Sequence, residues 1–539
     1  PFYRDGQLRL ASSGRGVWGR DMKDTLFSPI AQPITYADSL YCARDTSYFD
    51  CYSILKHQGA SWYWNISPQP AFIDSDSIRN PKVYFGAAGS YSVSLTVTDA
   101  QGNSDTKTIA NMVTVSSDCE PDTIPGKAVK CQSNSSYVQT ALLPLYNTDS
   151  VTFSAWIKHS GSQNDYSGII INDASQTAGL NIRTGNMLGY HWPGGHWYWN
   201  SGLVVPLNEW SHVAMVVTPN GVTIYLNGVG STHAISLSPA DLSYLKMGSY
   251  KGWNSRNFNG EIDEVCIWDR ALSQDEIREL RHLTRTGITP FSKNLVVYYQ
   301  FNSSQADIAL DRVGGGHAGL VGTAQKVISS APVGGGESDR LQISSSGKYM
   351  LPNTETEIHI TQPQPNGEIV LTRINWIPNT LPSSNPYTEN YWILNNYANT
   401  FGALDTLKFK PTLGSSFGDP NDFNLYTRQE NGDLNNWNLN CAAWGKDGGT
   451  YNYDNSCNIS NGSQFFIQSN SNNAIQSGFI GIVENSFSSE MKLYPNPNEG
   501  QLTLELGKTY STISIRIMNS IGQQVFSKYY SDSEKINLN

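Results

Sequence analysis

The stretch "EWSHVAMVVTPNGVTIYLNGVGS", Glu209 to Ser231, decides the fold of the central part of this chain. Two Asn-Gly pairs, Asn220-Gly221 and Asn227-Gly228, stand next to alternating apolar residues. An Asn-Gly pair in this setting is the strongest short-range hairpin signal, because both residues tolerate the positive φ angles of a type I′ turn. The stretch therefore predicts antiparallel strands joined by tight turns.

Two more phrases extend this pattern. "VTFSAWIK" begins at Val151, and "NFNGEIDEVCIWDRALSQDEIREL" follows the predicted hairpins. In this order the three phrases resemble a laminin-G-like, concanavalin-type jelly roll, which implies such a domain over residues 119–285. The stretch Ala271 to Leu280 is predicted to be helical, with Ser273 as N-cap and Glu276 completing a capping box.

The composition fits a chain of several strand-rich domains. At 539 residues the chain is too long for one hydrophobic core. Charged residues make up 15% of it, against roughly 25% in an ordinary soluble domain, and 29 Tyr and 14 Trp favour strands. The net charge of −10 argues against nucleic acid as a partner, because phosphate contacts need clustered Lys and Arg. We expect an all-β string of sandwich domains.

The N-terminal segments resemble extracellular modules. Residues 1–28 include "YRDGQLRLASSGRGVW", which resembles the closing strands of an Asp-box β-propeller, although a cut end explains it equally well. Residues 29–118 include "NPKVYFGAAGSYSVSLTVTDAQGNSDTKTI", which resembles polycystic-kidney-disease-type (PKD) immunoglobulin-like domains and implies a spacer. Tyr91 to Val97 alternates apolar with polar residues, which predicts a half-buried strand. Because the chain opens abruptly at Pro1, we interpret the missing signal peptide as missing upstream sequence.

Two segments follow the predicted jelly roll. Residues 286–336 are predicted to form partial jelly-roll strands and a linker, because "NLVVYYQFNSSQADIALDRVGGGHAGLVG" opens like a jelly roll and Gly334-Gly335-Gly336 marks a boundary. Residues 337–484 are predicted to form a further β-sandwich of unknown role, with strands such as "EIVLTRINW" and "SQFFIQS".

The C-terminal stretch "KLYPNPNEGQLTLEL" starts at Lys492. Its prolines fix an extended lead-in, a polar turn follows, and alternating leucines predict a half-buried strand. Together with "ISIRIMNSIGQQVF", it resembles the type A C-terminal sorting domain of the type IX secretion system, assigned to residues 485–539 and incomplete at Asn539. The resemblance implies export across the outer membrane to the cell surface or exterior, with a shuttle barrel, translocon and sortase as partners. The expected signal residues are Tyr494, Pro495, Asn496, Pro497 and Gly500.

The seven cysteines indicate an oxidising compartment rather than a zinc site, because no CxxC pair occurs. Close spacing predicts local Cys42/Cys51 and Cys441/Cys457 disulfides. Cys131 and Cys266 are also expected in disulfides, while the connectivity among Cys119, Cys131 and Cys266 stays open.

An aromatic stretch, "GYHWPGGHWYWNSG" from Gly189 to Gly202, is the candidate ligand site. Trp197 and Trp199 lie two positions apart on a predicted strand and so share a face, with Tyr198 on the other. Flat apolar rings match the C–H faces of sugars, although the same rings could belong to a core. His191 and His196 flank a turn and make only a weak metal pair. The expected ligand-binding residues are Trp192, His196, Trp197, Tyr198 and Trp199.

Asp263, in "GEIDEV", is the candidate metal ligand. The jelly-roll resemblance implies a structural Ca²⁺ held by an acidic residue in the last strand and by backbone carbonyls near the first, here around Gln132 to Ser135. Calcium prefers such hard oxygen ligands. The Asp-Gly that is usual after the first strand is Gln132-Ser133 here, and Ca²⁺ is the one cofactor expected.

No catalytic constellation emerges from the sequence. HExxH is absent, and Gly414 to Gly418 satisfies GxSxG without a following helix. No Glu-x-Asp-x-x-Glu phrase of laminarinase-type enzymes occurs in the jelly roll. We therefore predict a surface or secreted binding and adhesion protein whose jelly roll contacts glycans or another surface. The alternatives are an accessory region of a secreted glycoside hydrolase or protease whose catalytic domain lies upstream, and a spacer without a ligand.

The tripeptide Asp-[Ser/Thr]-[Ile/Leu/Val] occurs six times. It resembles the general O-glycosylation signal of the bacterial group that uses this sorting tail. The resemblance implies glycans on Thr25, Ser39, Ser77, Thr123, Ser150 and Thr406.

Overall fold

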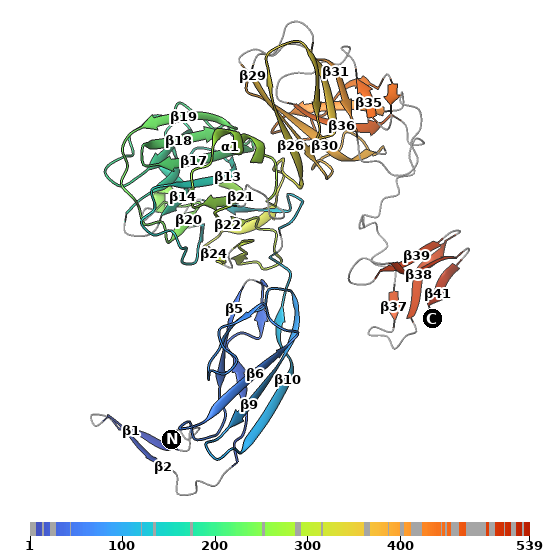
Figure 1. The fold of residues 1–539 in the computed structure, drawn as a ribbon. Coiled ribbons are helices and arrows are strands. Elements are labelled where there is room, and N and C mark those ends of the chain that lie inside the picture. The colour runs from blue at the N-terminus through green and yellow to red at the C-terminus, as the bar shows by residue number, and fades with distance from the viewer. Residues whose placement is uncertain are drawn as a thin grey trace. The chain divides into compact units, whose positions relative to one another are not determined.

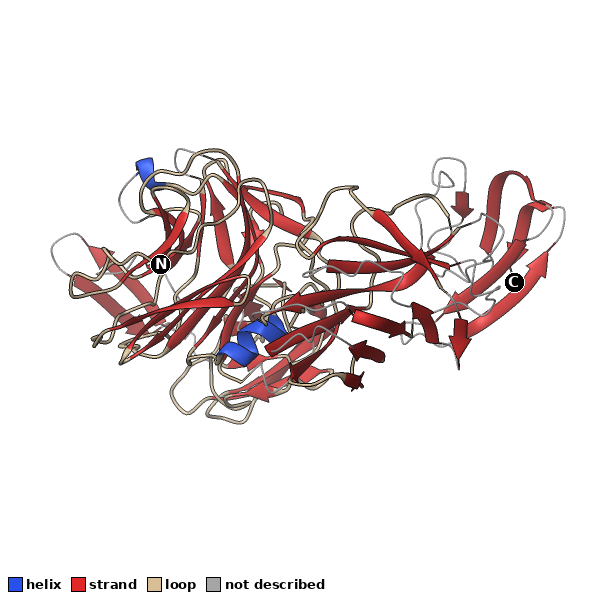
Figure 2. Cartoon of the chain, turned by 90° about the horizontal axis from the view of Figure 1, so that it is seen from above, coloured by secondary structure: helices blue, strands red, loops and turns tan. Residues whose placement is uncertain are grey.

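The computed structural model is nearly all β, with 53% of the chain in strands and 2% in helices, which confirms the predicted fold class. It describes residues 7–12, 16–21, 28–43, 45–119, 121–132, 136–172, 176–250, 254–285, 293–313, 316–360, 367–385, 387–398, 404–410, 423–443, 445–447, 450–453, 463–470, 492–494, 502–510, 513–518, 524–530 and 533–538. The chain divides into one unit of residues 1–413 with 417–475 and another of residues 414–416 with 476–539. Figure 1 shows the sheets along the chain, and Figure 2 shows how few segments are helical.

The first unit begins with a hairpin and a small sandwich. The hairpin joins β1 (Gln7–Ser12) and β2 (Gly16–Asp21). One sheet of the sandwich has the order β4 (Ser39–Leu40), β10 (Ser104–Val115), β9 (Gly89–Thr98), β6 (Ser61–Ser67). The other has the order β3 (Pro33–Thr35), β5 (Thr46–Cys51), β8 (Lys82–Tyr84), β7 (Phe72–Ile73). Alternate residues of β9 are buried, which confirms its predicted half-buried pattern.

The jelly roll follows, with two sheets that enclose one core. The eight-stranded sheet has the order β19 (Val229–Ala234), β18 (Gly221–Leu226), β17 (Ser211–Thr218), β13 (Val151–His159), β21 (Gly260–Trp268), β11 (Lys127–Cys131), β25 (Gln325–Ile328), with β22 (Leu295–Tyr299) also on β21. The seven-stranded sheet has the order β16 (Met187–His191), β15 (Gly179–Arg183), β14 (Ser167–Asn172), β20 (Leu245–Met247), β12 (Tyr137–Gln139), β24 (Ala318–Val321), β23 (Ile308–Ala309). Strands from residues 295–328 thus complete both sheets, whereas a partial unit and linker were expected there. They cover β11 and β12, which would otherwise be unpaired edges.

Helix α1 (Gln274–Leu280) starts three residues later than the predicted stretch. Ser273 and Glu276 form the predicted capping box, with each side chain bonded to the other residue's backbone. Ile277 and Leu280 pack in an apolar cluster with Trp268 of β21. The helix therefore covers the outer side of the eight-stranded sheet.

A second sandwich completes the first unit. Its six-stranded sheet has the order β26 (Gly336–Ile343), β29 (Gly367–Ile374), β30 (Tyr387–Asn396), β36 (Ser463–Ser469), β32 (Phe423–Gln429), β33 (Asn438–Ala442). Its five-stranded sheet has the order β27 (Gly347–Leu351), β28 (Thr356–Ile360), β31 (Leu404–Phe409), β35 (Thr450–Tyr453), β34 (Gly445–Asp447). The buried side chains of Trp392, Phe409 and Phe465 lie at its core.

The second unit has two small sheets of its own. One has the order β37 (Lys492–Tyr494), β38 (Leu502–Tyr510), β41 (Ser533–Leu538), and the other pairs β39 (Ile513–Met518) with β40 (Gln524–Tyr530). Among the described residues, no helix is long and apolar enough to cross a membrane.

The disulfides differ from the predicted local pairs. Cys42 is bonded to Cys119, 77 residues away, so the predicted Cys42/Cys51 pair is wrong. Cys51 ends β5 and lies in the core of its sandwich, whereas Cys42 belongs to a separate apolar cluster with Cys119 and Leu310. Cys51, Cys131 and Cys266 are free and buried, so Cys131 and Cys266 are not in the predicted disulfides. Burial raises the pKa of the Cys131 and Cys266 thiols to about 12, which keeps them protonated and unreactive.

Some predicted residues lie outside the described part of the chain. Cys441 is disulfide-bonded, but its predicted partner Cys457 is not described. Tyr494 ends β37. The predicted glycosylation site Thr25 and the predicted sorting-signal residues Pro495, Asn496, Pro497 and Gly500 also lie outside the described residues.

Candidate functional site

The outer face of the seven-stranded sheet carries polar side chains where β15 and β16 pair. The register pairs are Gly179 with His191, Asn181 with Gly189, and Arg183 with Met187. Opposite residues in an antiparallel pair share a face, so His191, Asn181 and Arg183 lie on one side. The residues between them point into the jelly-roll core: Leu180, Ile182, Leu188 and Tyr190.

Asn181 is fully buried, and neither its Oδ1 nor its Nδ2 has a hydrogen-bond partner. Glycines flank it on both neighbouring strands, with Gly189 on β16 and Gly168 on β14. The side chain of Arg183 covers Gly189, since a Cβ there would lie 2.7 Å from Cδ of Arg183. Leaving a buried amide unpaired costs about 1–3 kcal/mol. An orphaned polar group of this kind points to a water or ligand that completes it.

Three aromatic rings form a series that leads from this face to solvent. The ring of His191 stacks on Trp197, with centroids 5.2 Å apart and planes 24° apart. Trp197 in turn lies 4.8 Å from Tyr198, centroid to centroid. Tyr198 is 71% exposed, so the outermost ring of the series is available to a ligand.

Two tyrosines and two arginines surround His191. Oη of Tyr250 lies 2.8 Å from Nδ1 of His191, and the ring of Tyr166 lies 5.8 Å from the His191 ring. The Arg256 guanidinium lies 4.9 Å from both tyrosine rings, and that of Arg183 lies 5.2 Å from Tyr166. Tyr166 has a φ of +64°, a left-handed conformation that bulky residues seldom adopt. Such strained residues concentrate at functional sites.

The positive charge of the site comes from its guanidinium groups. Burial, followed by the charges of Arg256 and Arg183, lowers the pKa of His191 to about 4, so this ring is neutral at pH 7. Burial raises the pKa of Tyr250, which therefore keeps its proton. Arg183 donates from Nη1 to the carbonyl of Tyr198 at 3.0 Å, and this bond ties the charged group to the exposed ring.

The predicted one-face arrangement of Trp197 and Trp199 is not observed. Residues 197–200 lie outside any strand. Trp199 stacks on His233 of β19, with centroids 5.2 Å apart, and packs against the core. It also contacts Tyr190, which neighbours His191 on β16 and so points to the opposite face. The two tryptophans therefore belong to different surroundings.

Trp192 and His196 have structural contacts. Trp192 is 1% exposed, and its Nε1 donates to the carbonyl of Ser238 at 2.8 Å, so it is a core residue. His196 pairs with Trp192 through backbone hydrogen bonds of 3.0 and 3.3 Å across a turn. Of the five predicted ligand-binding residues, Trp197 and Tyr198 belong to the ring series.

The sequence analysis missed the other members of the site. Asn181 sits between two apolar residues in "GLNIR", a pattern that an ordinary solvent-facing residue would also give. Only the tertiary structure joins these residues, because they come from separate strands and loops. The missed residues are Tyr166, Asn181, Arg183, Tyr250 and Arg256.

Asp263 is fully buried on β21. Its Oδ2 accepts a hydrogen bond from Oγ of Ser329 at 2.6 Å, and its Oδ1 accepts one from the backbone N–H of Glu264 at 2.7 Å. Burial and the adjacent Glu264 carboxylate raise the pKa of Asp263 well above its usual range. Each oxygen thus has one hydrogen-bond partner within the chain. Because residues 133–135 lie outside the described part, the calcium site stays a prediction.

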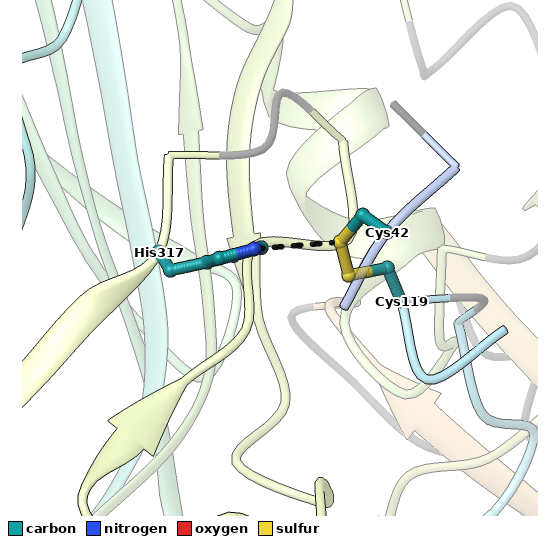
Figure 3. A group of neighbouring side chains, drawn as sticks. All are labelled: Cys42, Cys119 and His317. Atoms are coloured by element: carbon teal, nitrogen blue, oxygen red, sulfur yellow. Dashed lines mark hydrogen bonds between the residues drawn. A yellow bond between two sulfur atoms is a disulfide. The ribbon is translucent and has the colours of Figure 1, made fainter. Parts of the chain in front are cut away.

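Cys42, Cys119 and His317 form a cluster whose ligand atoms lie within 4.8 Å of one another (Figure 3). Two observations indicate that the cluster is a disulfide with a histidine beside it and not a metal site. The two sulfur atoms are bonded to each other. Nδ1 of His317 accepts the backbone N–H of Asp311 at 3.2 Å, which leaves the ring proton on Nε2, 3.2 Å from Oδ2 of Asp45. A zinc-bound Nε2 would instead require its lone pair, with the proton on Nδ1.

The second sandwich has a polar cavity of its own, with a volume of about 330 Å³. Arg373 and Glu355 form an ion pair of 2.6 Å at its wall. The remaining lining residues are Glu337, Pro352, Asn353 and Asn375. This cavity lacks the exposed aromatic ring that marks the jelly-roll face, so we assign it no role.

Two family models match parts of the chain. Residues 132–278 match the concanavalin A-like lectin/glucanases superfamily, and residues 492–539 match a secretion system C-terminal sorting domain. The sorting domain indicates export across the outer membrane, to the cell surface or the extracellular space, and an interaction with the type IX secretion machinery. No curated protein matches the chain.

Solved structures that match parts of this chain share little sequence with it. A Bacteroides ovatus protein described as carbohydrate binding is 18% identical, covering 57% of this chain and 95% of its own, with a TM-score of 0.32. Domain 4 of an extracellular arabinanase from Geobacillus stearothermophilus, in complex with arabinotriose, is 21% identical, and the match covers 26% of this chain and 69% of the arabinanase chain, with a TM-score of 0.22. A heptameric pentraxin from Limulus polyphemus is 14% identical, and the match covers 36% of this chain and 95% of the pentraxin chain, with a TM-score of 0.28.

Proposed function

We propose that this chain is a surface or secreted adhesion protein whose jelly roll binds glycans on the outer face of its seven-stranded sheet. One observation carries the proposal: a stacked ring series ends in the exposed ring of Tyr198 and lies beside a buried amide, Asn181, that has no partner. Sugar recognition needs these two elements, an apolar ring for the C–H face and fixed polar groups for hydroxyls.

The geometry favours a rigid platform. Trp197 is held between His191 and Tyr198, and the Tyr198 carbonyl accepts from Arg183. A ring that is already ordered loses little conformational entropy when a ligand stacks on it. The exposed end of the series is therefore suited to a surface ligand.

The neighbouring domains would hold the jelly roll away from the cell surface. We propose that the small sandwich of residues 29–118 is a PKD-type spacer, which its two four-stranded sheets support. O-Glycans on the Asp-Ser/Thr tripeptides are likewise a proposal, and three of the acceptors are exposed: Ser39, Ser77 and Thr123. Ser150 is half-buried, and the side chain of Thr406 is not described.

A glycan array probed with the whole chain tests the binding proposal. Tyr198→Ala should weaken binding about five- to thirtyfold, because a stacking ring contributes on the order of 1–2 kcal/mol, while the exposed side chain contributes little to the fold. Tyr146→Ala is the matched control, since Tyr146 is also an exposed tyrosine of the jelly roll, at 57%. A chain that binds no array glycan, or a Tyr198→Ala variant that binds like the wild type, would overturn the proposal.

A further inference from the structure

The charges around His191 bear on which saccharides this face accepts. The guanidinium groups of Arg183 and Arg256 both lie over the ring of Tyr166, at 5.2 and 4.9 Å from its centroid. Next to burial, both positive charges lower the pKa of His191. The ring series that ends at Tyr198 begins at this same histidine.

Arg183 is bonded to the ring series, and Arg256 lies over Tyr250, whose hydroxyl contacts His191. Arg183 donates to the carbonyls of Tyr198 and Trp199, at 3.0 and 3.4 Å. Its Nε lies 3.7 Å from Oδ1 of Asp165, so this carboxylate partly offsets the charge of Arg183. Its side chain is 20% exposed, and Arg256 is half-buried, so both groups border on solvent. A sugar stacked on the platform would therefore sit beside a fixed positive charge.

We infer that the glycan bound at this face is anionic, a pyranoside that carries a carboxylate or a sulfate ester. The inference rests on the proposed function and names its ligand class. Guanidinium groups pair with both anions through two parallel N–H···O bonds, which are about twice as strong as neutral hydrogen bonds. The neutral His191 contributes a ring surface to the same face.

The test compares acidic polysaccharides with neutral relatives, using the whole chain. Polygalacturonate against its full methyl ester is the carboxylate arm, and κ-carrageenan against agarose is the sulfate arm. We expect the acidic member of at least one arm to bind at least about tenfold more tightly, and this preference to shrink when NaCl rises from about 50 to 500 mM. Binding in one arm alone identifies the anion, and binding in both shows that the charge decides.

Two variants separate charge from packing. Arg256→Gln should lower the ratio of acidic to neutral affinity about tenfold, and Arg256→Lys should recover part of this preference. Lys246→Gln is the matched control, because Lys246 also lies over a tyrosine ring, 4.6 Å from that of Tyr137, on β20, which β14 and β15 separate from β16. Thermal unfolding of each variant checks that the fold is retained.

The outcomes distinguish this inference from the proposed function. If neutral members bind as tightly as acidic ones and Tyr198→Ala still weakens them, the anionic ligand class is wrong and glycan binding stands. If Arg256→Gln and Lys246→Gln behave alike toward the acidic ligand, the inference is also overturned. If no polysaccharide binds at all, the proposed function fails with it.

Discussion

The two sheets of the jelly roll share one core, but their outer faces differ. The eight-stranded sheet is covered by apolar side chains, with Trp268 and Tyr298 packed against α1, and with Trp156, Trp210 and Val333 in a second cluster. The seven-stranded sheet instead carries a partnerless amide and, above it, charged and aromatic groups at its β15–β16 edge. One outer face has become a further core, and the other carries the ring series and the two guanidinium groups.

The difference separates packing from binding. Strands β13 and β17 are buried at nearly every position because both of their faces contact apolar groups. The buried amide and the left-handed Tyr166 each cost free energy on the other side, and such costs are typical of functional sites.

The largest effect is expected on the covered face. Trp156 is 1% exposed, and its Nε1 donates to the carbonyl of Arg281 at 2.8 Å. Trp156→Ala should lower the free energy of unfolding of the jelly roll by about 3–5 kcal/mol, because it leaves a large cavity and an unpaired carbonyl. Urea unfolding, followed by hydrogen exchange of β13 and β17, measures this loss.

The same variant should leave glycan affinity unchanged wherever it is still folded, since Trp156 lies on the opposite sheet from the ring series. A loss below about 1 kcal/mol would show that the covered face is not a second core. A folded Trp156→Ala chain that no longer binds would break the division between the two faces.

The covered face is also the part that the sequence predicts well. The Asn227-Gly228 turn has φ angles of +51° and +79°, as its dipeptide predicts, and joins β18 to β19. The capping box of α1 forms as expected. These signals are local, because turn chemistry and capping involve residues within a few positions of one another.

The outer face at the β15–β16 pair, which we propose to bind glycans, could be predicted only in part. The aromatic stretch was identified, but its period did not reveal that Trp192 and Trp199 turn inward while Trp197 and Tyr198 turn outward. Arg183, His191 and Arg256 come together only when β15, β16 and the loop after β20 are in place. The long-range Cys42–Cys119 bond was missed for the same reason, because spacing along the chain does not give distance in space.

A second, smaller effect should appear when pH is lowered, and it belongs to the binding face. Burial and the two arginines hold the pKa of His191 at about 4, below its ordinary value of 6.5. As pH falls below 6.5 the unfolded chain takes up this proton first, so the stability present above pH 6.5 is lost progressively down to pH 4. At pH 4.5 the jelly roll has lost about 2–3 kcal/mol of its free energy of unfolding through this group.

His191→Gln should remove this contribution. Between pH 7 and pH 4.5 the wild-type jelly roll should lose about 2–3 kcal/mol more than the variant in urea unfolding. Burial also lowers the pKa of His212 and His282, but both remain in the variant, so their effect cancels in the difference. Equal losses in the two chains would mean that His191 is not held neutral by its arginine neighbours.

The smallest effect has the opposite sign and tests the cost of the binding face directly. Asn181→Ala removes a buried amide whose two polar atoms have no partner, so it should raise the free energy of unfolding by about 1 kcal/mol. The same substitution should weaken glycan binding, because it removes donors and an acceptor that a ligand could use. Asn172→Ala is the contrasting variant: Asn172 is equally buried on β14, and its Nδ2 donates to the carbonyl of Asp241 at 2.6 Å, so its loss should destabilise the domain. Urea unfolding and affinity measurements on both variants decide the matter. If Asn181→Ala destabilises the jelly roll as much as Asn172→Ala, the amide has a structural partner such as a bound water, and the two outer faces differ less than we infer.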